Sequence, residues 1–153
     1  MSANEFEAII NYLFKMKLLH KGSSISLYNW GEPFLNPELN DILNILGKNS
    51  LNASLSSNFI KKVDIKPENY KYISSVVFSL CSLEKENYKR IYGANIANVL
   101  VNFDAFLQKK SSTILDYNQE FTGSNINSMN MSLKKLKITL TSAMYGLSLY
   151  MHT

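Results

Sequence analysis

Cysteine is almost absent from this sequence of 153 residues, which contains Cys81 alone. One thiol excludes an internal disulfide, and by itself it cannot hold a cluster that needs several thiolates. We therefore interpret Cys81 as a small, partly buried thiol. His20 has no second ligand at helical or loop spacing, so we assign no metal-binding residue.

Arginine is equally scarce, because Arg90 is the single arginine among the 16 basic residues. The other basic residues are lysines scattered along the chain, and the net charge of +4 with an isoelectric point near 9.1 reflects their excess. Planar, bidentate contacts to phosphates and bases depend on clustered arginine. The sequence therefore predicts no nucleic-acid partner.

Long apolar runs are also missing. No stretch approaches the roughly 20 apolar residues that cross a membrane, and the N-terminus carries Glu5 and Glu7 in place of a basic, apolar leader. We expect a cytoplasmic protein with no membrane partner. The length suits one domain, but it is short of the roughly 250 residues of a full eight-unit barrel.

The sequence does contain an alternation of helical and strand patterns. Apolar residues recur at helical spacing in some segments and form short strand-like runs in others. The expected helices are Asn4–Leu19, Pro37–Leu46, Pro67–Tyr72 (a helix or a turn), Lys85–Tyr92 and Ile96–Lys109. The expected strands are Ile25–Tyr28, Leu51–Leu55, Ile73–Leu80 and Leu136–Leu140. This order predicts an α/β fold with four or five mostly parallel strands, arranged as a partial, open (β/α) barrel.

The segment 26–37, SLYNWGEPFLNP, joins the first strand to the second helix. Pro33 favours an extended conformation of Glu32, and Gly31 favours an unusual backbone conformation. Asn36 followed by Pro37 favours the start of a helix. Glu32 would then lie at the carboxyl end of a strand, where α/β sheets and barrels bind ligands. An ordinary strand-to-helix turn explains the same residues. After the next strand, Ser56, Ser57 and Asn58 suit hydrogen bonding to a ribose or a carboxylate, and a capped turn is an equally good interpretation of them.

Three segments together resemble the radical S-adenosylmethionine (SAM) enzymes. YNWGEPFLNPEL is similar to their Gly-Glu-Pro segment, and SLSSNF, from Ser54, is similar to the end of their third strand. VVFSL, from Val76, and the helices that follow resemble the fourth unit of the SPASM-type branch, which modifies peptides. The resemblance covers residues 4–110 and implies a barrel whose cofactors are SAM and a 4Fe-4S cluster.

The resemblance implies SAM contacts from residues at the ends of the strands. Gly31, Glu32 and Pro33 would lie against the SAM amino group, Ser56 and Asn58 near its ribose and carboxylate, and Ser79 beside the same crevice. Two residues depart from the family pattern. Tyr92 stands where relatives commonly have an arginine, and Trp30 replaces a small residue. A phenol cannot supply the charge or the fork of a guanidinium.

The cluster motif of that family, C-x3-C-x2-C, is absent from this chain, and no catalytic residue is assigned. Two interpretations follow. The chain is a fragment or truncated form of a radical SAM enzyme, inactive alone; alternatively, it is a non-catalytic binding or accessory module derived from such a barrel. Its partners would be a peptide or protein substrate, or a chain that supplies a missing strand.

The region after residue 110 departs from the resemblance. We expect residues 1–110 to form the partial barrel, 111–130 a polar loop, and 131–153 a C-terminal strand and tail. If the strand before residue 25 is missing, Ile25–Tyr28 exposes an unpaired edge. We expect that edge to lead to self-association or to docking of a partner, in preference to cover from residues 136–151.

Overall fold

The computed structural model describes residues 1–29, 31–80, 82, 84–121, 137–143 and 146–152, with backbone alone for 113–121 and for the last two ranges. The helices are α1 (Ala3–Lys15), α2 (Leu39–Lys48), α3 (Lys85–Tyr92) and α4 (Ile96–Phe121), with short 3-10 helices η1 (Pro33–Leu35) and η2 (Pro67–Tyr72). The strands are β1 (Ser24–Ser26), β2 (Asn52–Ser57), β3 (Ile73–Leu80), β4 (Lys137–Ala143) and β5 (Gly146–His152).

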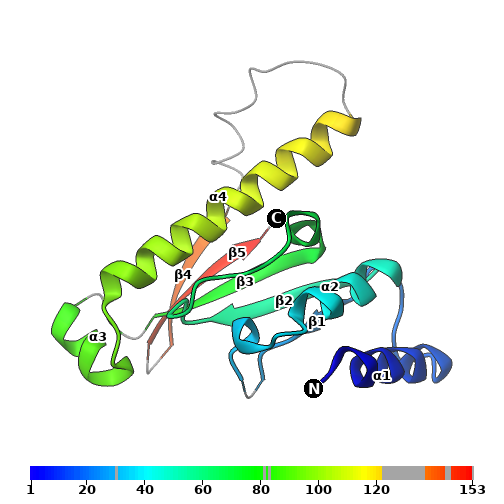
Figure 1. The fold of residues 1–153 in the computed structure, drawn as a ribbon, viewed down its shortest axis with the longest axis horizontal. Helices are drawn as coiled ribbons and strands as arrows, with labels where there is room; N and C mark the ends of the chain where they lie inside the picture. Colours follow the sequence, from blue (N-terminus) through cyan, green and yellow to red (C-terminus); the bar gives the residue numbers. More distant parts are fainter. Residues whose placement is uncertain (30, 81, 83, 122–136, 144–145, 153) are drawn as a thin grey trace.

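All the described strands form one sheet with the order β1-β2-β3-β5-β4 (Figure 1). β1 pairs with β2 and β2 with β3 in parallel, which confirms the predicted parallel sheet of the first three strands. β5 runs antiparallel to both β3 and β4. The sheet is therefore mixed and not mostly parallel, because the two-residue link between β4 and β5 allows only a hairpin.

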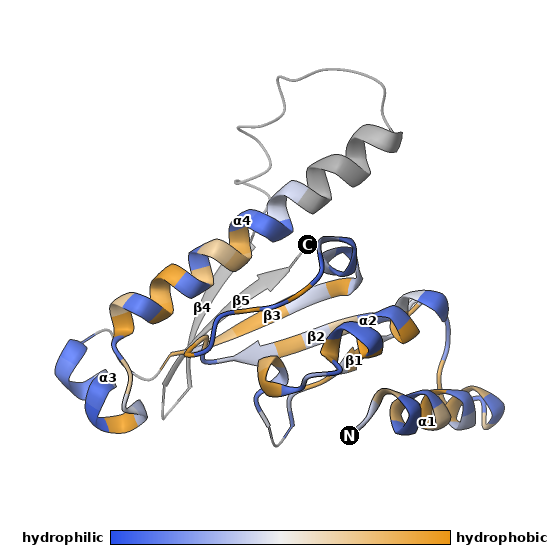
Figure 2. Cartoon of the chain, in the orientation of Figure 1, coloured by the Kyte–Doolittle hydropathy of each residue, from blue (hydrophilic) through white to orange (hydrophobic). Residues whose placement is uncertain are grey.

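Helices α2 and α4 cover one face of the sheet (Figure 1). Every second residue of β2 is buried, and residues of β3 in register with them are buried too. Figure 2 shows apolar residues on these strands and along the described part of α4. The core centres on Phe59, whose ring lies 5.0–5.4 Å from those of Phe34, Phe78, Phe103 and Phe106. Tilted and edge-on pairs of this kind stabilise a core beyond simple burial of area.

The alternate positions of the parallel strands face away from this helix layer and are rich in serine. Register places Ser26 beside Ser54, and Ser54 beside Ser75. The hydroxyls of Ser54 and Ser75 lie 2.7 Å apart. Parallel sheets are usually apolar on both faces because helices cover both. In the described part of the sheet this second face is therefore mixed, since half-buried serines share it with the buried Val77.

Three helix boundaries differ from the sequence expectation. α1 ends at Lys15, since Lys17 adopts a left-handed conformation (φ 59°) that stops the helix before Gly22. α2 begins at Leu39, because the preceding residues form η1 and an Asn36 turn. α4 continues to Phe121, so residues 111–121 are helical and not loop. The spacing of Ile114, Tyr117 and Phe121 prolongs the helical pattern through this polar segment. The rest of the expected loop, 122–130, lies outside the described residues.

Candidate functional site

Glu32 joins the loops that follow β1 and β2. One of its carboxylate oxygens, Oε1, accepts a hydrogen bond from the backbone N–H of Phe34 (3.3 Å), which caps η1. The other, Oε2, accepts from the backbone N–H of Asn58 (3.1 Å), just beyond the end of β2. Glu32 is extended (φ −90°, ψ 110°), as expected for a residue before proline. The predicted placement of Glu32 at the carboxyl ends of the strands is confirmed.

The serines predicted for the same crevice also meet. Ser56 and Ser79 lie near the carboxyl ends of β2 and β3, and their hydroxyls are 2.9 Å apart. Both are half-buried, so each keeps contact with solvent. Because a hydroxyl offers one donor and two acceptor positions, this pair retains capacity for a ligand.

The loop after β2 is fixed by local hydrogen bonds. Asn58 accepts at its side-chain oxygen from the N–H of Ile60 (3.0 Å), and its carbonyl accepts from the Tyr88 phenol (3.4 Å). The buried Ser57 hydroxyl accepts from the N–H of Phe59 (2.9 Å). Phe59 itself has a left-handed backbone (φ 53°), a conformation uncommon outside glycine. The side-chain oxygen of Asn58 is therefore used within its own turn, and its backbone N–H makes the contact with Glu32.

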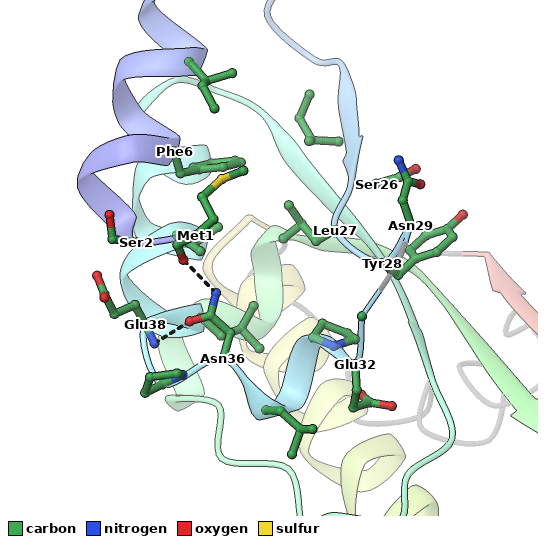
Figure 3. A pocket seen from close by; sticks show the side chains of 18 residues that line it. Met1, Ser2, Phe6, Ser26, Leu27, Tyr28, Asn29, Glu32, Asn36 and Glu38 are labelled. Carbon is green, nitrogen blue, oxygen red and sulfur yellow. Dashed lines mark hydrogen bonds between the residues drawn. The ribbon is translucent and has the colours of Figure 1, made fainter.

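A cavity of about 930 Å³ opens beside these loops, between α1, the outer edge of β1 and the start of α2 (Figure 3). Gly31, Glu32 and Pro33 line it, together with Tyr28 and Asn29. Ser56, Asn58 and Ser79 do not line it. The six predicted site residues thus divide into two adjoining groups: a cavity wall after β1, and a polar cluster at the ends of β2 and β3. Glu32 belongs to both groups.

The predicted unusual backbone conformation of Gly31 is wrong, since Gly31 does not have a positive φ. Space does not require glycine at this position either. A Cβ atom added to Gly31 would meet nothing within 4 Å, and the residue is exposed. Trp30 and Cys81 lie outside the described residues. Tyr92 packs against Tyr88 with tilted rings, whose centroids lie 5.1 Å apart.

Sequence reasoning missed the α1 wall of the cavity, which Phe6 and Ile9 form. The signal was present in the sequence, since the apolar stripe of residues 4–19 is wider than one buried face requires. Phe6 and Ile10 are buried, whereas Ile9, Tyr12 and Met16 are about half exposed, at 44%, 59% and 51%. Of these three exposed residues, Ile9 lines the cavity.

The opposite end of the sheet contains a buried lysine that sequence reasoning also missed. Lys110, on α4, is 4% exposed, and its ammonium donates to the carbonyls of Ile73 (2.6 Å) and Tyr70 (3.4 Å). Burial lowers the pKa of Lys110 to about 8. Burial, and then the charge of Asp64, raises the pKa of Tyr70 to about 12. Two backbone carbonyls satisfy the amine, which indicates a structural role.

In the described part of the chain, no three His, Cys, Asp or Glu side chains are grouped as metal ligands. None of the described helices is both long enough and apolar enough to cross a membrane. Comparisons with protein-family models, curated proteins and solved structures find no match to this chain.

Proposed function

We propose that this chain is part of a radical SAM-type enzyme, in which the carboxyl ends of β1, β2 and β3 bind the amino-acid end of SAM. The observation that supports this proposal most is the link from Glu32 to Asn58, with the Ser56–Ser79 pair beside it, at the carboxyl ends of parallel strands. Ligands of open parallel sheets bind at that end. We also propose that the chain has a radical SAM-type barrel fold and a cytoplasmic location.

The residues fit the ammonium group of SAM but not its carboxylate. Each Glu32 oxygen accepts one backbone hydrogen bond and has a second lone pair for an ammonium. The backbone of Gly31 is open to close approach by a ligand. For the SAM carboxylate, the described crevice residues Gly31, Glu32, Pro33, Ser56, Asn58 and Ser79 include no cation. We therefore assign only the ammonium contact, with Glu32 as its acceptor.

The residues do not fit a 4Fe-4S cluster, since one cysteine cannot replace three thiolate ligands. In this proposal the cluster belongs to a segment outside the sequence studied, and no reaction step is assigned to the chain. Anaerobic reconstitution with iron and sulfide, followed by dithionite and SAM, should give no 5′-deoxyadenosine above background. Production of 5′-deoxyadenosine by the pure protein would overturn this part of the proposal.

A second candidate function is a non-catalytic binding or accessory module whose SAM crevice is degenerate. The observation that favours it is that both oxygens of Glu32 already accept backbone hydrogen bonds, which is sufficient for a purely structural carboxylate. In this case the crevice holds the loops together and binds no cofactor.

Titration calorimetry with SAM separates the two candidates. The enzyme-derived reading predicts saturable binding that Glu32→Gln weakens at least tenfold, because the substitution removes the charge that attracts the ammonium. Glu68→Gln, on the exposed first turn of η2, is a matched control and should bind like the parent protein. Absence of SAM binding by the folded parent protein would favour the module.

A further inference from the structure

We propose that the cavity at the outer edge of β1 is a docking groove for an extended peptide of another protein, which pairs with β1 and adds a strand to the sheet. The proposed peptide carries apolar side chains at alternate positions and a basic side chain beside them. This inference does not depend on SAM binding, since it rests on the edge of β1, on α1 and on the carboxylates of Glu32 and Glu38 in the lining of the cavity.

The hydrogen bonds of β1 determine which backbone groups are available. The N–H of Leu27 donates to the carbonyl of Ser54 (3.0 Å), and the carbonyl of Ser23 accepts from the N–H of Asn52 (3.0 Å). Backbone groups alternate in direction along a strand, so odd-numbered residues face β2. Within β1, Ser24 and Ser26 therefore direct their N–H and carbonyl groups outward. Among the described strands, β1 is the last on its side of the sheet.

The groove lies along this outward edge. Five consecutive residues, 25–29, form one wall, and Phe6 with Ile9 of α1 forms another (Figure 3). Leu39 and Ile42 of α2 are also part of the lining. An edge strand beside an apolar wall is the arrangement that recognises extended peptides: the backbone gives affinity, and pockets for alternate side chains give specificity.

Charge indicates the chemistry of the occupant. Although the chain has a net charge of +4, the charged side chains that line the groove are Glu32 and Glu38, and its lining includes no lysine or arginine. Glu38 lies at the α1 end, where it accepts a hydrogen bond from the N–H of Ala3 (2.8 Å). Such a surface favours a peptide with a positive side chain. Symmetric pairing of two copies through this edge would instead place Glu32 and Glu38 opposite the same carboxylates of the other copy, which like-charge repulsion disfavours.

The test is fluorescence anisotropy with a labelled peptide that alternates valine and threonine and has a lysine at each end. Methyl groups on alternate amide nitrogens leave the peptide one hydrogen-bonding edge and prevent its own aggregation. We expect saturable binding to the parent protein. A peptide of the same sequence methylated at every amide nitrogen cannot pair with a strand and should not bind.

Two substitutions test the mode of docking. Ser26→Pro removes an outward N–H without removing a bond to β2, and proline is tolerated on such edges. It should weaken peptide binding at least tenfold, whereas Ser26→Ala should not change it. Ile9→Lys, at the exposed rim, should weaken binding of the lysine peptide by a similar factor. Circular dichroism checks that each variant is folded.

The proposal would be overturned if the peptide with one hydrogen-bonding edge did not bind, or if the fully methylated peptide bound equally well. It would also be overturned if folded Ser26→Pro bound the peptide as tightly as the parent protein does. Sedimentation that shows a dimer of the parent protein and a monomer of Ser26→Pro would identify a second copy as the occupant instead. If the parent protein binds the peptide but does not bind SAM, only the proposed function is contradicted. Calorimetry with SAM and anisotropy with the peptide are separate measurements.

Discussion

The polar groups at the two ends of the parallel strands differ in how deeply they are buried. At the amino end of β3, Lys110 is 4% exposed and two backbone carbonyls hold its amine. At the carboxyl end, the polar groups of Glu32, Ser56 and Ser79 are half-buried, contact one another or nearby loops, and remain accessible to solvent. In barrels of parallel strands the first kind of end contributes stability and the second binds ligands. The difference suggests the same division here.

The largest expected effect concerns the aromatic core beneath the carboxyl-end loop. Phe59 is fully buried and contacts four other rings. Phe59→Ala should lower the free energy of unfolding by about 3–5 kcal/mol, the usual cost of removing a buried phenylalanine. Urea denaturation followed by fluorescence measures the loss. A loss below about 1 kcal/mol would mean that the carboxyl-end loop does not rest on this core.

The next effect tests the buried amine at the amino end. The pKa of Lys110 is lowered from 10.5 to about 8 in the folded protein, so between these pH values the unfolded chain binds a proton that the folded chain has released. Stability should therefore rise from pH 8 to pH 10, by up to about 3 kcal/mol for such a shift. Above pH 10 the raised pKa of Tyr70 acts in the opposite direction, because the folded phenol keeps its proton up to about pH 12. Stability should then fall.

Lys110→Met is the matched variant for this pH dependence. Methionine fills similar space without a titrating group, so the rise in stability between pH 8 and pH 10 should disappear. Urea unfolding at several pH values gives the comparison. A rise of the same size in the variant would assign the pH dependence to other groups. Peptide and SAM binding at pH 7 should be unchanged by this substitution if the amino end has only a structural role.

Glu32→Ala should have a smaller effect on stability. It leaves the N–H groups of Phe34 and Asn58 without their acceptor, and water reaches them only partly. We expect a loss of about 1–2 kcal/mol, the typical cost of unpaired donors. Amide hydrogen exchange should show faster exchange at Asn58 than in the parent protein. Unchanged protection of Asn58 would contradict the structural link between the loops.

Gly31→Ala should have the smallest effect. The added methyl group meets no atom within 4 Å, so the free energy of unfolding should change by less than about 0.5 kcal/mol. At Gly47, by contrast, an added Cβ would overlap the ring of Tyr72, so Gly47→Ala should destabilise the protein clearly. Thermal unfolding of the two variants side by side makes the comparison. If Gly31→Ala retains stability but loses SAM affinity, the ligand approaches this backbone closely.

Sequence periodicity predicted the parallel sheet because its strands carry strong local signals. Ile73–Leu80 matches β3 at both ends. The apolar residues at helical spacing in the expected helix Pro37–Leu46 are buried: Leu39, Ile42, Leu43 and Leu46. The direction of the C-terminal strands could not be predicted in the same way, since the pairing of β5 with β3 depends on contacts between residues far apart in sequence. Within the expected helix Ile96–Lys109, apolar spacing alone does not show that Leu100 is 42% exposed while the buried face follows Val99, Phe103 and Phe106.

The candidate site was predicted in part for a similar reason. The glycine and the proline on either side of Glu32 predicted its place at the end of a strand. The parallel pairing of β1 with β2 then places Glu32 beside Asn58. The bond between Ser56 and Ser79 needed the register of β2 against β3, which a sequence pattern does not specify. Lys110 was missed because a lysine in a polar stretch of helix is usually solvated.

The most direct test of the difference between the two ends is a titration of ¹⁵N-labelled protein with SAM, followed through its amide resonances. The account predicts shifts of the Gly31, Asn58 and Ser79 amides at the carboxyl ends of the strands. The amides of Ile73 and Lys110, at the other end, should stay in place. Shifts confined to the amino end, or none at millimolar SAM, would contradict the assignment of a ligand site to the carboxyl ends.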